Sequence, residues 1–331
     1  MIRYLQSPSV DPYWNLALEQ VLFDTLDEND SCLMFWQNDN AVIIGKYQNA
    51  SSEINAPFVK EHRIKVARRL SGGGAVYHDM GNLNFTFIVN CGEPNFDFSV
   101  YCEPIIRALR TLGVAAELSG RNDISINGKK CSGNAQYYRK GRLMHHGTLL
   151  YDSNLDVLGR ALDVPADEIE SKGIRSVPSR VTNIKPHMRE SATVETFRDC
   201  LRRFLFQEHE GLMTECGLHS TELEMAKTLC DTKYALWDWN YGRSPDSSIR
   251  KKRRIEGCGT IEAYMDVEKF TIRRLAFHGD YFGHEDSQML AQQLIGCPLE
   301  EDELHHRLAG LPVSSYFHNL SEEKLIALIL C

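Results

Sequence analysis

The chain has 331 residues, 43% of them hydrophobic and 25% charged, which is typical of a soluble globular protein with one large domain and room for a smaller one. Its net charge of -8, the absence of an apolar export signal at the N-terminus and the absence of 18 uninterrupted apolar residues argue against nucleic-acid binding, export and membrane spanning. The ten cysteines are scattered singly without a CxxC pair, so we expect reduced thiols and a cytoplasmic protein.

The first predicted element is a helix over 11–26, where Asp11 can cap and Pro12 suits the first helical position. Strands are predicted over 31–37, 40–47 and 82–90, the last with apolar and polar residues in alternation. Between the last two strands lies the sequence RRLSGGGAVYHDMGN, residues 68 to 82, whose three consecutive glycines are expected on a bend.

A hairpin is predicted over 121–136, because Asn127 and Gly128 are a strong two-residue turn signal between alternating segments. Another strand follows over 142–152. Helices are then expected over 193–209 and 221–230, the second beginning with a capping box. The two residues assigned to this box are Thr221 and Glu224.

The sequence WDWNYGRSPDSSIRKKRR, residues 237 to 254, interrupts the periodic segments and marks a domain boundary. We therefore expect one domain over 1–245 and a second over 250–331, the second with a short antiparallel sheet over 259–283 followed by two or three helices. Hairpins interleaved with helices, without regular βαβ alternation, favour an α+β fold.

The three glycines do not fit the common phosphate-binding loops. The sequence has no GxxxxGK followed by Ser or Thr, and the glycines lead into a strand rather than opening a helix. Successive bare NH groups can still form a nest for an anion, with Arg68 and Arg69 adding positive charge. The alternative is a glycine bulge at a sheet corner with solvated arginines, and the motif alone does not separate the two.

The 121–136 hairpin favours the anion site, because Lys130 on its returning strand could reach a phosphate or carboxylate. Asp123 could position Mg²⁺ or an amine, or simply cap a turn. His146 could serve the site or be a buried, hydrogen-bonded histidine. Cys131 has no histidine base beside it in sequence and is better explained as a packed thiol. No spacing of His and Cys fits a zinc site.

Taken together, these residues resemble the lipoate–protein ligase A family, relatives of the biotin ligases. The resemblance covers essentially the whole chain and implies a catalytic domain of the class II aminoacyl-tRNA synthetase and biotin ligase type, with a small C-terminal α+β accessory domain. Any one motif is moderately specific, whereas the ordered set is highly specific. In chain order the motifs are RRLSGGGAVYHDMGN, GRNDISINGKKCSGNA, HHGTLL, KGIRSVPSRVTNI and WDWNYGRSP.

The resemblance implies a reaction in two steps. ATP and lipoate give lipoyl-AMP and pyrophosphate, and the lipoyl group then passes to a lysine of a lipoyl domain. The implied acceptors are the acyltransferase subunits of 2-oxo acid dehydrogenases and the glycine-cleavage H protein, and Mg²⁺ is the implied metal ion.

The resemblance also implies roles for individual residues. Lys130 matches the lysine that contacts both the lipoate carboxyl and the adenylate phosphate, and Asp123 is assigned with it as catalytic and as a candidate Mg²⁺ ligand. The positions that match nucleotide-contacting residues are Arg69, Gly74, Ala75, Val76 and Tyr77. Those assigned to lipoate or the adenylate are Ser71, Gly72, Gly73, His78, Asn82, Asn122, His146, Thr148 and Arg180, with Trp36, Val42 and the Leu83 strand as candidates for the apolar slot.

Two further segments can be interpreted in terms of function. Residues 171–184 resemble the adenylate-binding loop, which would order over the intermediate and exclude water; a plain exposed linker is the alternative. The basic run 250–254 could steer an acidic acceptor domain, although such runs are usually solvated faces.

Two other functions compete with the ligase. One is an ATP-independent octanoyl or lipoyl transferase acting on lipoyl domains, and the other is a catalytically silent protein that binds lipoyl domains or senses lipoate. The arginines before the glycines and the C-terminal domain resemble the ligase pattern rather than the transferase pattern.

Overall fold

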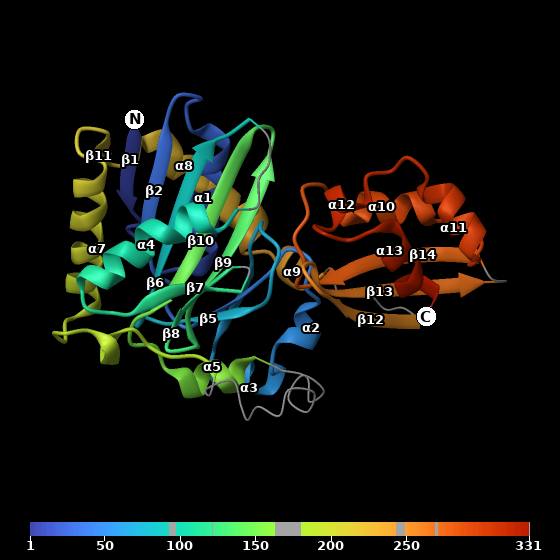
Figure 1. Ribbon diagram of the computed structural model, residues 1–331, viewed down its shortest axis with the longest axis horizontal. Coiled ribbons are helices and arrows are strands. Elements are labelled where there is room, and N and C mark those ends of the chain that lie inside the picture. Colours follow the sequence, from blue (N-terminus) through green and yellow to red (C-terminus); the bar gives the residue numbers. More distant parts are fainter. Residues whose placement is uncertain (93–96, 121, 163–179, 243–248, 269–270, 331) are drawn as a thin grey trace.

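A computed structural model describes residues 1–92, 97–120, 122–162, 180–242, 249–268 and 271–330. Its largest feature is an eight-stranded sheet in the order β11-β1-β2-β6-β10-β9-β8-β7 (Figure 1). β1 runs parallel to β2 and β11, and the remaining pairs are antiparallel. The strands are β1 (Ile2–Gln6), β2 (Ser31–Trp36), β6 (Asn82–Asn90), β7 (Ala116–Ser119), β8 (Asp123–Ile126), β9 (Lys129–Arg139), β10 (Arg142–Leu150) and β11 (Met213–Glu215).

Helices cover both faces of this sheet, and alternation along β2 explains why. Leu33 and Phe35 pack in the core beneath α4 and α7, whereas Met34 and Trp36 pack in the core beneath α1 and α8. The expected cap on the first helix is confirmed, since the Asp11 carboxylate accepts from two backbone NH groups of α1. The helices are α1 (Pro12–Thr25), α4 (Ser99–Thr111), α7 (Val194–Glu208) and α8 (Ser220–Leu229).

A small three-stranded sheet, in the order β4-β3-β5, lies beside the large one and carries the glycine bend. The bend falls between β4 (Lys65–Arg68) and β5 (Val76–His78), as the sequence predicted, and β3 (Ala41–Ile44) lies between them in the sheet. The short elements around it are α2 (Ala50–Glu53), α3 (Ala56–Glu61), α5 (Leu155–Ala161), η2 (Lys185–His187), η3 (Cys230–Tyr234) and α9 (Trp237–Asn240).

The C-terminal part has its own core between an antiparallel sheet and several helices, which confirms the expected α+β fold with a small C-terminal unit. The proposed boundary falls largely within 243–248, outside the described residues, and stays a prediction. In the part of the chain that the structure describes, no helix is long and apolar enough to cross a membrane. The elements are β12 (Ile249–Ile255), β13 (Gly259–Glu268), β14 (Thr271–Gly279), α10 (Ser287–Leu294), α11 (Glu301–Leu308), α12 (Val313–Tyr316) and α13 (Glu322–Leu330).

The two parts meet close to the glycine bend. The rings of Tyr47 and Tyr281 stack with centroids 4.8 Å apart, and the Lys46 ammonium lies 3.2 Å from the Asp286 carboxylate. Phe282, from the C-terminal part, packs into the core of the large domain. The C-terminal part therefore contributes directly to the packing around the predicted site.

The capping box predicted at Thr221 and Glu224 is wrong. The capping residue lies two positions earlier, at His219, and the carboxylate of Glu222 accepts from the backbone NH of His219. The Glu222 carboxylate also pairs with Arg3 at 2.8 Å, a contact with β1 that local sequence does not reveal.

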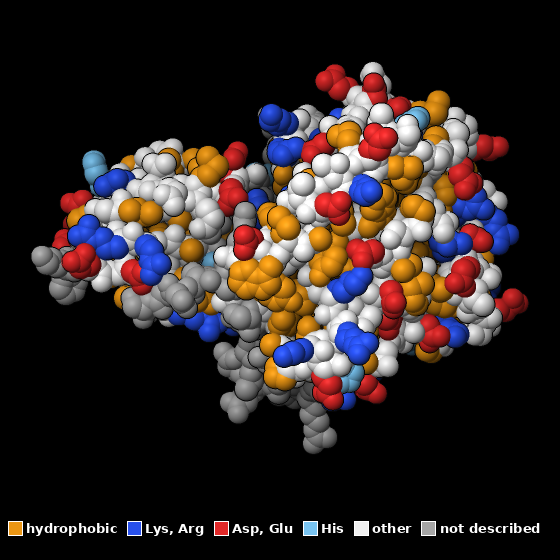
Figure 2. All heavy atoms as spheres, turned by 180° about the vertical axis from the view of Figure 1, so that it is seen from behind, with side chains coloured by type: hydrophobic (Ala, Val, Ile, Leu, Met, Phe, Trp, Pro, Cys, Tyr) orange, Lys and Arg blue, Asp and Glu red, His pale blue; other side chains and the backbone are white. Residues whose placement is uncertain are grey.

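The basic run lies on β12, an edge strand of the C-terminal sheet. Arg250 and Lys252 both lie within salt-bridge distance of the buried Glu262 carboxylate, so part of its charge is neutralised locally. On the face of the molecule seen in Figure 2, acidic and basic side chains are interspersed.

Candidate functional site

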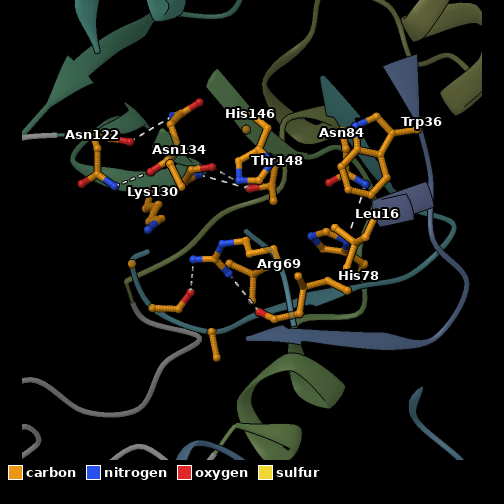
Figure 3. A pocket seen from close by; sticks show the side chains of 18 residues that line it. Leu16, Trp36, Arg69, His78, Asn84, Asn122, Lys130, Asn134, His146 and Thr148 are labelled. Atoms are coloured by element: carbon orange, nitrogen blue, oxygen red, sulfur yellow. Dashed lines mark hydrogen bonds between the residues drawn. The ribbon is translucent and has the colours of Figure 1, made fainter. Parts of the chain in front are cut away.

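A pocket that opens to solvent, with about 580 Å³ of empty space when its open mouth is included, lies between the small sheet, α1 and strands β9 and β10. Figure 3 shows Lys130 and Asn122 at one end and Leu16 and Trp36 at the other, with Arg69 between them. The pocket is therefore cationic at one end and apolar at the other. Its lining residues are Leu16, Trp36, Ile43, Arg69, Gly73, Gly74, Ala75, Val76, His78, Asn84, Asn122, Lys130, Gly133, Asn134, Ala135, His146, Gly147 and Thr148.

Arg69 is a buried guanidinium that organises the glycine bend. It donates to the carbonyls of Gly72 at 2.7 Å, Gly74 at 2.8 Å and Ile43 at 3.1 Å, and to the Ser71 hydroxyl at 3.0 Å. Burial lowers the pKa of Arg69 to about 10, so it stays charged at neutral pH. A fixed positive charge thus lies against the pocket wall.

Each glycine of the bend is explained by different surroundings. A Cβ on Gly72 would lie 2.1 Å from the carbonyl oxygen of Tyr281, so this glycine is required by the C-terminal part. Gly73 has φ +86 and donates its NH to the same oxygen at 3.3 Å. A Cβ on Gly74 would meet nothing within 4 Å, and Gly74 lines the pocket. Gly74 is the glycine whose backbone a ligand can approach.

Lys130 reaches the cationic end from β9, where its ammonium lies 2.8 Å from the Asp123 carboxylate. Both side chains are about one-third exposed, at 39% and 33%. A Cβ on Gly133 would lie 2.9 Å from the Lys130 Nζ, so that glycine leaves space for the lysine. The backbone of Lys130 is held by the Arg180 carbonyl at 2.8 Å and the Thr182 NH at 2.9 Å.

Amide groups close the pocket behind Lys130. The Asn122 side chain donates to the Asn134 carbonyl at 2.5 Å, and the Asn134 side chain donates to the Asn122 carbonyl at 2.9 Å. The Thr148 hydroxyl accepts from the Gly133 NH at 3.1 Å. These bonds fix the hairpin that carries Lys130 against β10.

A buried chain of hydrogen bonds connects Arg69 to a carboxylate on α1. Ser71, which accepts from Arg69, lies 2.6 Å from the Nε2 of His146, whose Nδ1 lies 2.9 Å from the Oε1 of Glu19. Thr86 donates to the same oxygen at 2.7 Å. With His146 neutral, every donor in this chain finds an acceptor. His146 is thus both a buried, hydrogen-bonded histidine and a pocket residue.

Most of the residues predicted from sequence gather at this pocket, but some do not line it. Ser71 supports Arg69, and Asp123 pairs with Lys130 outside the lining. Tyr77 donates its hydroxyl to Asn40, and the Asn82 amide donates to Asn84 at 2.9 Å. Val42 and Leu83 do not line the pocket, because each packs in a hydrophobic core, Val42 with residues of α3 and α5 and Leu83 with residues of α4 and α7. The predicted adenylate loop, 171–184, falls mostly outside the described residues.

Sequence reasoning missed several residues that line or support the pocket. Glu19 is a carboxylate on the buried face of an apolar helix, four residues after Asn15 and three before Leu22, and that periodicity could have identified it. Asn134 follows Lys130 on β9, but the register of the β8–β9 pair shifts between Ile124 and Ser125, so simple alternation along the strand could not have placed the two side chains. Asn84 lies on the polar face of β6, which the alternation already indicated.

The comparisons with known proteins agree with this arrangement. Residues 11–206 match the family model of the lipoyl protein ligase A/B catalytic domain, and residues 244–329 match that of the bacterial lipoate protein ligase C-terminus. The chain is 43% identical over 321 residues to the lipoate-protein ligase LplJ of Bacillus subtilis, covering 96% of this chain and 97% of that protein.

Solved structures add three similarities. LipL1 of P. falciparum, in complex with lipoate, superposes over 100% of this chain and 99% of its own with a TM-score of 0.82, but at 24% identity it supports the fold alone. A bipartite lipoate protein ligase of Thermoplasma acidophilum, studied with its E2 lipoyl domain, has a TM-score of 0.66 and 30% identity over 75% of this chain and 98% of its own. A lipoate-protein ligase A bound with ATP has a TM-score of 0.61 and 28% identity over 73% and 98%.

Proposed function

The chain belongs to the lipoate–protein ligase family, and on that premise we propose that it uses ATP to activate lipoate and transfers the lipoyl group to a lysine of a lipoyl domain. The observation that carries the proposal is a single pocket with a cationic end at Lys130 and an apolar end at Trp36 and Leu16 (Figure 3). Such a pocket fits a carboxylate joined to an apolar tail.

In the first step, a carboxylate oxygen of lipoate attacks the α-phosphorus of ATP. A P–O bond forms, the bond to the departing pyrophosphate breaks, and lipoyl-AMP results. Two anions must approach each other, so a cation preorganised beside them lowers the barrier. The Lys130 ammonium meets this requirement, and Asp123 holds it in place until the substrates arrive.

In the second step, the acceptor lysine amine attacks the lipoyl carbonyl carbon. The amide C–N bond forms, the C–O bond to AMP breaks, AMP leaves as an anion and the amine loses a proton. Lys130 can offset the charge of the departing phosphate as it offset the entering one. The same side chain therefore serves both half-reactions.

We assign the nucleotide to Arg69 and the backbone from Gly74 to Tyr77. Support comes from the open backbone at Gly74 and from the similar ligase that was solved with ATP. The lipoate or adenylate side is assigned to Gly73, His78, Asn122, His146 and Thr148, which line the pocket. Ser71, Gly72, Asn82 and Arg180 are proposed to act through the residues that they hold.

Asp123 is the proposed ligand for Mg²⁺. Mg²⁺ is commonly held by one or two carboxylates together with substrate phosphates, and Asp123 is a partly exposed carboxylate beside the predicted phosphate position. A bound Mg²⁺ would neutralise phosphate charge there. Among the described residues no group of three or more His, Cys, Asp or Glu side chains could hold an ion unaided.

The proposed acceptors are lipoyl domains of 2-oxo acid dehydrogenase acyltransferase subunits and the glycine-cleavage H protein. A similar ligase was studied with its E2 lipoyl domain, which supports the first of these. We propose that the exposed part of β12 contributes to attracting an acidic acceptor. The cytoplasm is the proposed location, supported by the free thiols of all nine cysteines that the structure describes.

The ATP-independent transferase gains no support from Cys131, the cysteine nearest the site residues in sequence. This thiol is fully buried, and burial raises its pKa to about 12, so it is a poor nucleophile at neutral pH.

The proposal is tested by incubating the protein with ATP, Mg²⁺, lipoate and an apo lipoyl domain. Pyrophosphate release and a lipoyl mass on the acceptor lysine are expected, both dependent on ATP. Lys130→Ala is expected to lower pyrophosphate release by at least about 100-fold, while Lys129→Ala, an exposed neighbour, keeps the parent rate. Lipoylation without ATP, or parent activity in Lys130→Ala, would contradict the proposal.

A further inference from the structure

His78 lies at the apolar end of the pocket, where its side chain is 2% exposed (Figure 3). It is the last residue of β5, and its ring packs edge to face with Trp36 at 6.1 Å between centroids. Leu16 lies at the same end, and so does the buried Asn84, whose amide nitrogen lies 3.5 Å from the His78 Nδ1. An imidazole is a polar group in these surroundings, so each of its nitrogen atoms needs a partner.

The position of the ring proton follows from a chain of side-chain amides. The Asn15 NH₂ donates to the backbone carbonyls of Gln37 at 2.7 Å and Ser9 at 3.1 Å, which fixes the orientation of that amide. It also donates to the Asn38 Oδ1 at 2.8 Å. The Asn38 NH₂ must therefore face the Nδ1 of His78, at 3.0 Å.

Because Asn38 donates to Nδ1, that nitrogen is an acceptor and the proton of the neutral ring lies on Nε2. Burial, and then the nearby charge of Arg69, lower the pKa of His78 to about 3, so the ring is neutral at physiological pH. The Nε2 atom is buried and has no hydrogen-bond partner among the residues that the structure describes. An unpartnered N–H donor therefore lies in the wall of the cavity, on a residue that lines it beside Trp36 and Asn84.

Resting on the proposed function, we propose that the His78 Nε2–H donates to a sulfur atom of the dithiolane ring and selects dithiolane-bearing acids over plain alkanoic acids. Within the proposed substrate, the tail offers a hydrogen-bond acceptor only at its sulfur atoms. An alkanoyl tail such as octanoyl fills the cavity with methylene groups alone. His78 then stays unpaired, and a site built to hydrogen-bond its ligand rejects an analogue that lacks the acceptor.

The decisive probe is 5-cyclopentylpentanoate, in which two methylene groups replace the sulfurs of lipoate while the five-membered ring is kept. Pyrophosphate release is measured with lipoate, 5-cyclopentylpentanoate and octanoate as separate substrates. We expect kcat/KM for lipoate to exceed that for the carbocycle by about 5- to 20-fold, since one buried donor is satisfied in one complex only. This comparison uses the unaltered protein and does not depend on a variant folding.

Variants then locate the effect. His78→Phe keeps a ring without a donor and is expected to reduce the preference to about twofold or less, whereas His78→Gln restores an N–H donor and a measurable preference. His62→Phe, which changes a histidine outside the pocket lining, should leave the ratio at its parent value.

The outcomes separate the inference from the proposed function. No pyrophosphate release with any of the acids contradicts the ligase assignment itself. Release with lipoate and the carbocycle at equal kcat/KM overturns only the role of His78. An unchanged ratio in a folded His78→Phe variant, verified by its melting temperature, also overturns it.

Discussion

The two walls of the pocket are stabilised in opposite ways. On the glycine-bend wall, Arg69 is buried and makes four hydrogen bonds within its own segment and β3. On the hairpin wall, Lys130 and Asp123 form one ion pair and are each about one-third exposed. The first wall is fixed before any ligand arrives, whereas the second presents a charge that can exchange partners.

The difference indicates that Arg69 provides a fixed charge and Lys130 a movable one. A preorganised charge lowers a barrier because it needs no rearrangement as the reaction proceeds. A lysine that must contact a carboxylate, then an adenylate, then a departing phosphate needs freedom instead. We therefore expect substitutions of Arg69 to affect stability and activity together, and substitutions of Lys130 or Asp123 to affect activity alone.

The largest expected effect follows from Arg69→Lys. A lysine keeps the charge but cannot span three carbonyls and a hydroxyl, so buried acceptors lose their donor. We expect the free energy of unfolding to fall by about 3–5 kcal/mol, with pyrophosphate release lost in the same variant. Urea denaturation and the pyrophosphate assay measure the two effects.

The control for this substitution is Arg253→Lys, on the exposed edge strand β12, which should change neither quantity. A stable but inactive Arg69→Lys variant would show that the bend does not depend on the guanidinium for its structure. The contrast between the two walls would then be wrong.

The glycine bend itself illustrates what the sequence could predict. Three consecutive glycines between two strands indicated a backbone that something approaches closely, and their place on a bend is confirmed. The sequence could not say what approaches. At Gly72 it is the carbonyl of Tyr281, 209 residues further along the chain, because only the docked C-terminal part brings that oxygen there.

The hairpin was easier to predict, because its determinants are local. Asn127 and Gly128 adopt the positive φ values of 52° and 74° that a two-residue turn requires, so that Lys130 lies on the returning strand. Glu19 and Asn134 were missed because the residues that they contact lie on other elements and cannot be identified from their own. Tertiary contacts, rather than local propensity, define those parts of the site.

A second, intermediate effect separates Gly72 from Gly74. Gly72→Ala places a Cβ against the Tyr281 carbonyl, so we expect a loss of about 2–3 kcal/mol in unfolding free energy. Gly74→Ala meets no atom within 4 Å and should leave stability unchanged or raise it by about 0.5 kcal/mol. Thermal unfolding of the two variants measures the difference.

Gly74→Ala, which is expected to keep parent stability, should nevertheless change activity. If a nucleotide approaches the Gly74 backbone as proposed, an added methyl raises the KM for ATP in a protein of parent stability. Equal stability of the two alanine variants would contradict the packing explanation for Gly72, and an unchanged KM for ATP in Gly74→Ala would remove Gly74 from the nucleotide site.

The smallest effect on stability, and the sharpest test of the hairpin wall, comes from Asp123→Asn. A partly exposed ion pair contributes little, so we expect the unfolding free energy to change by less than about 1 kcal/mol. Pyrophosphate release should nevertheless fall by about tenfold, because Lys130 loses its orienting charge.

If Asp123 also holds Mg²⁺, half-maximal activity of Asp123→Asn will need more Mg²⁺ than that of the parent protein. If Asp123 only orients Lys130, the Mg²⁺ dependence will match the parent. Glu117→Gln, on the exposed neighbouring strand β7, is the matched control. A large loss of stability in Asp123→Asn would show that the hairpin wall is as constrained as the bend.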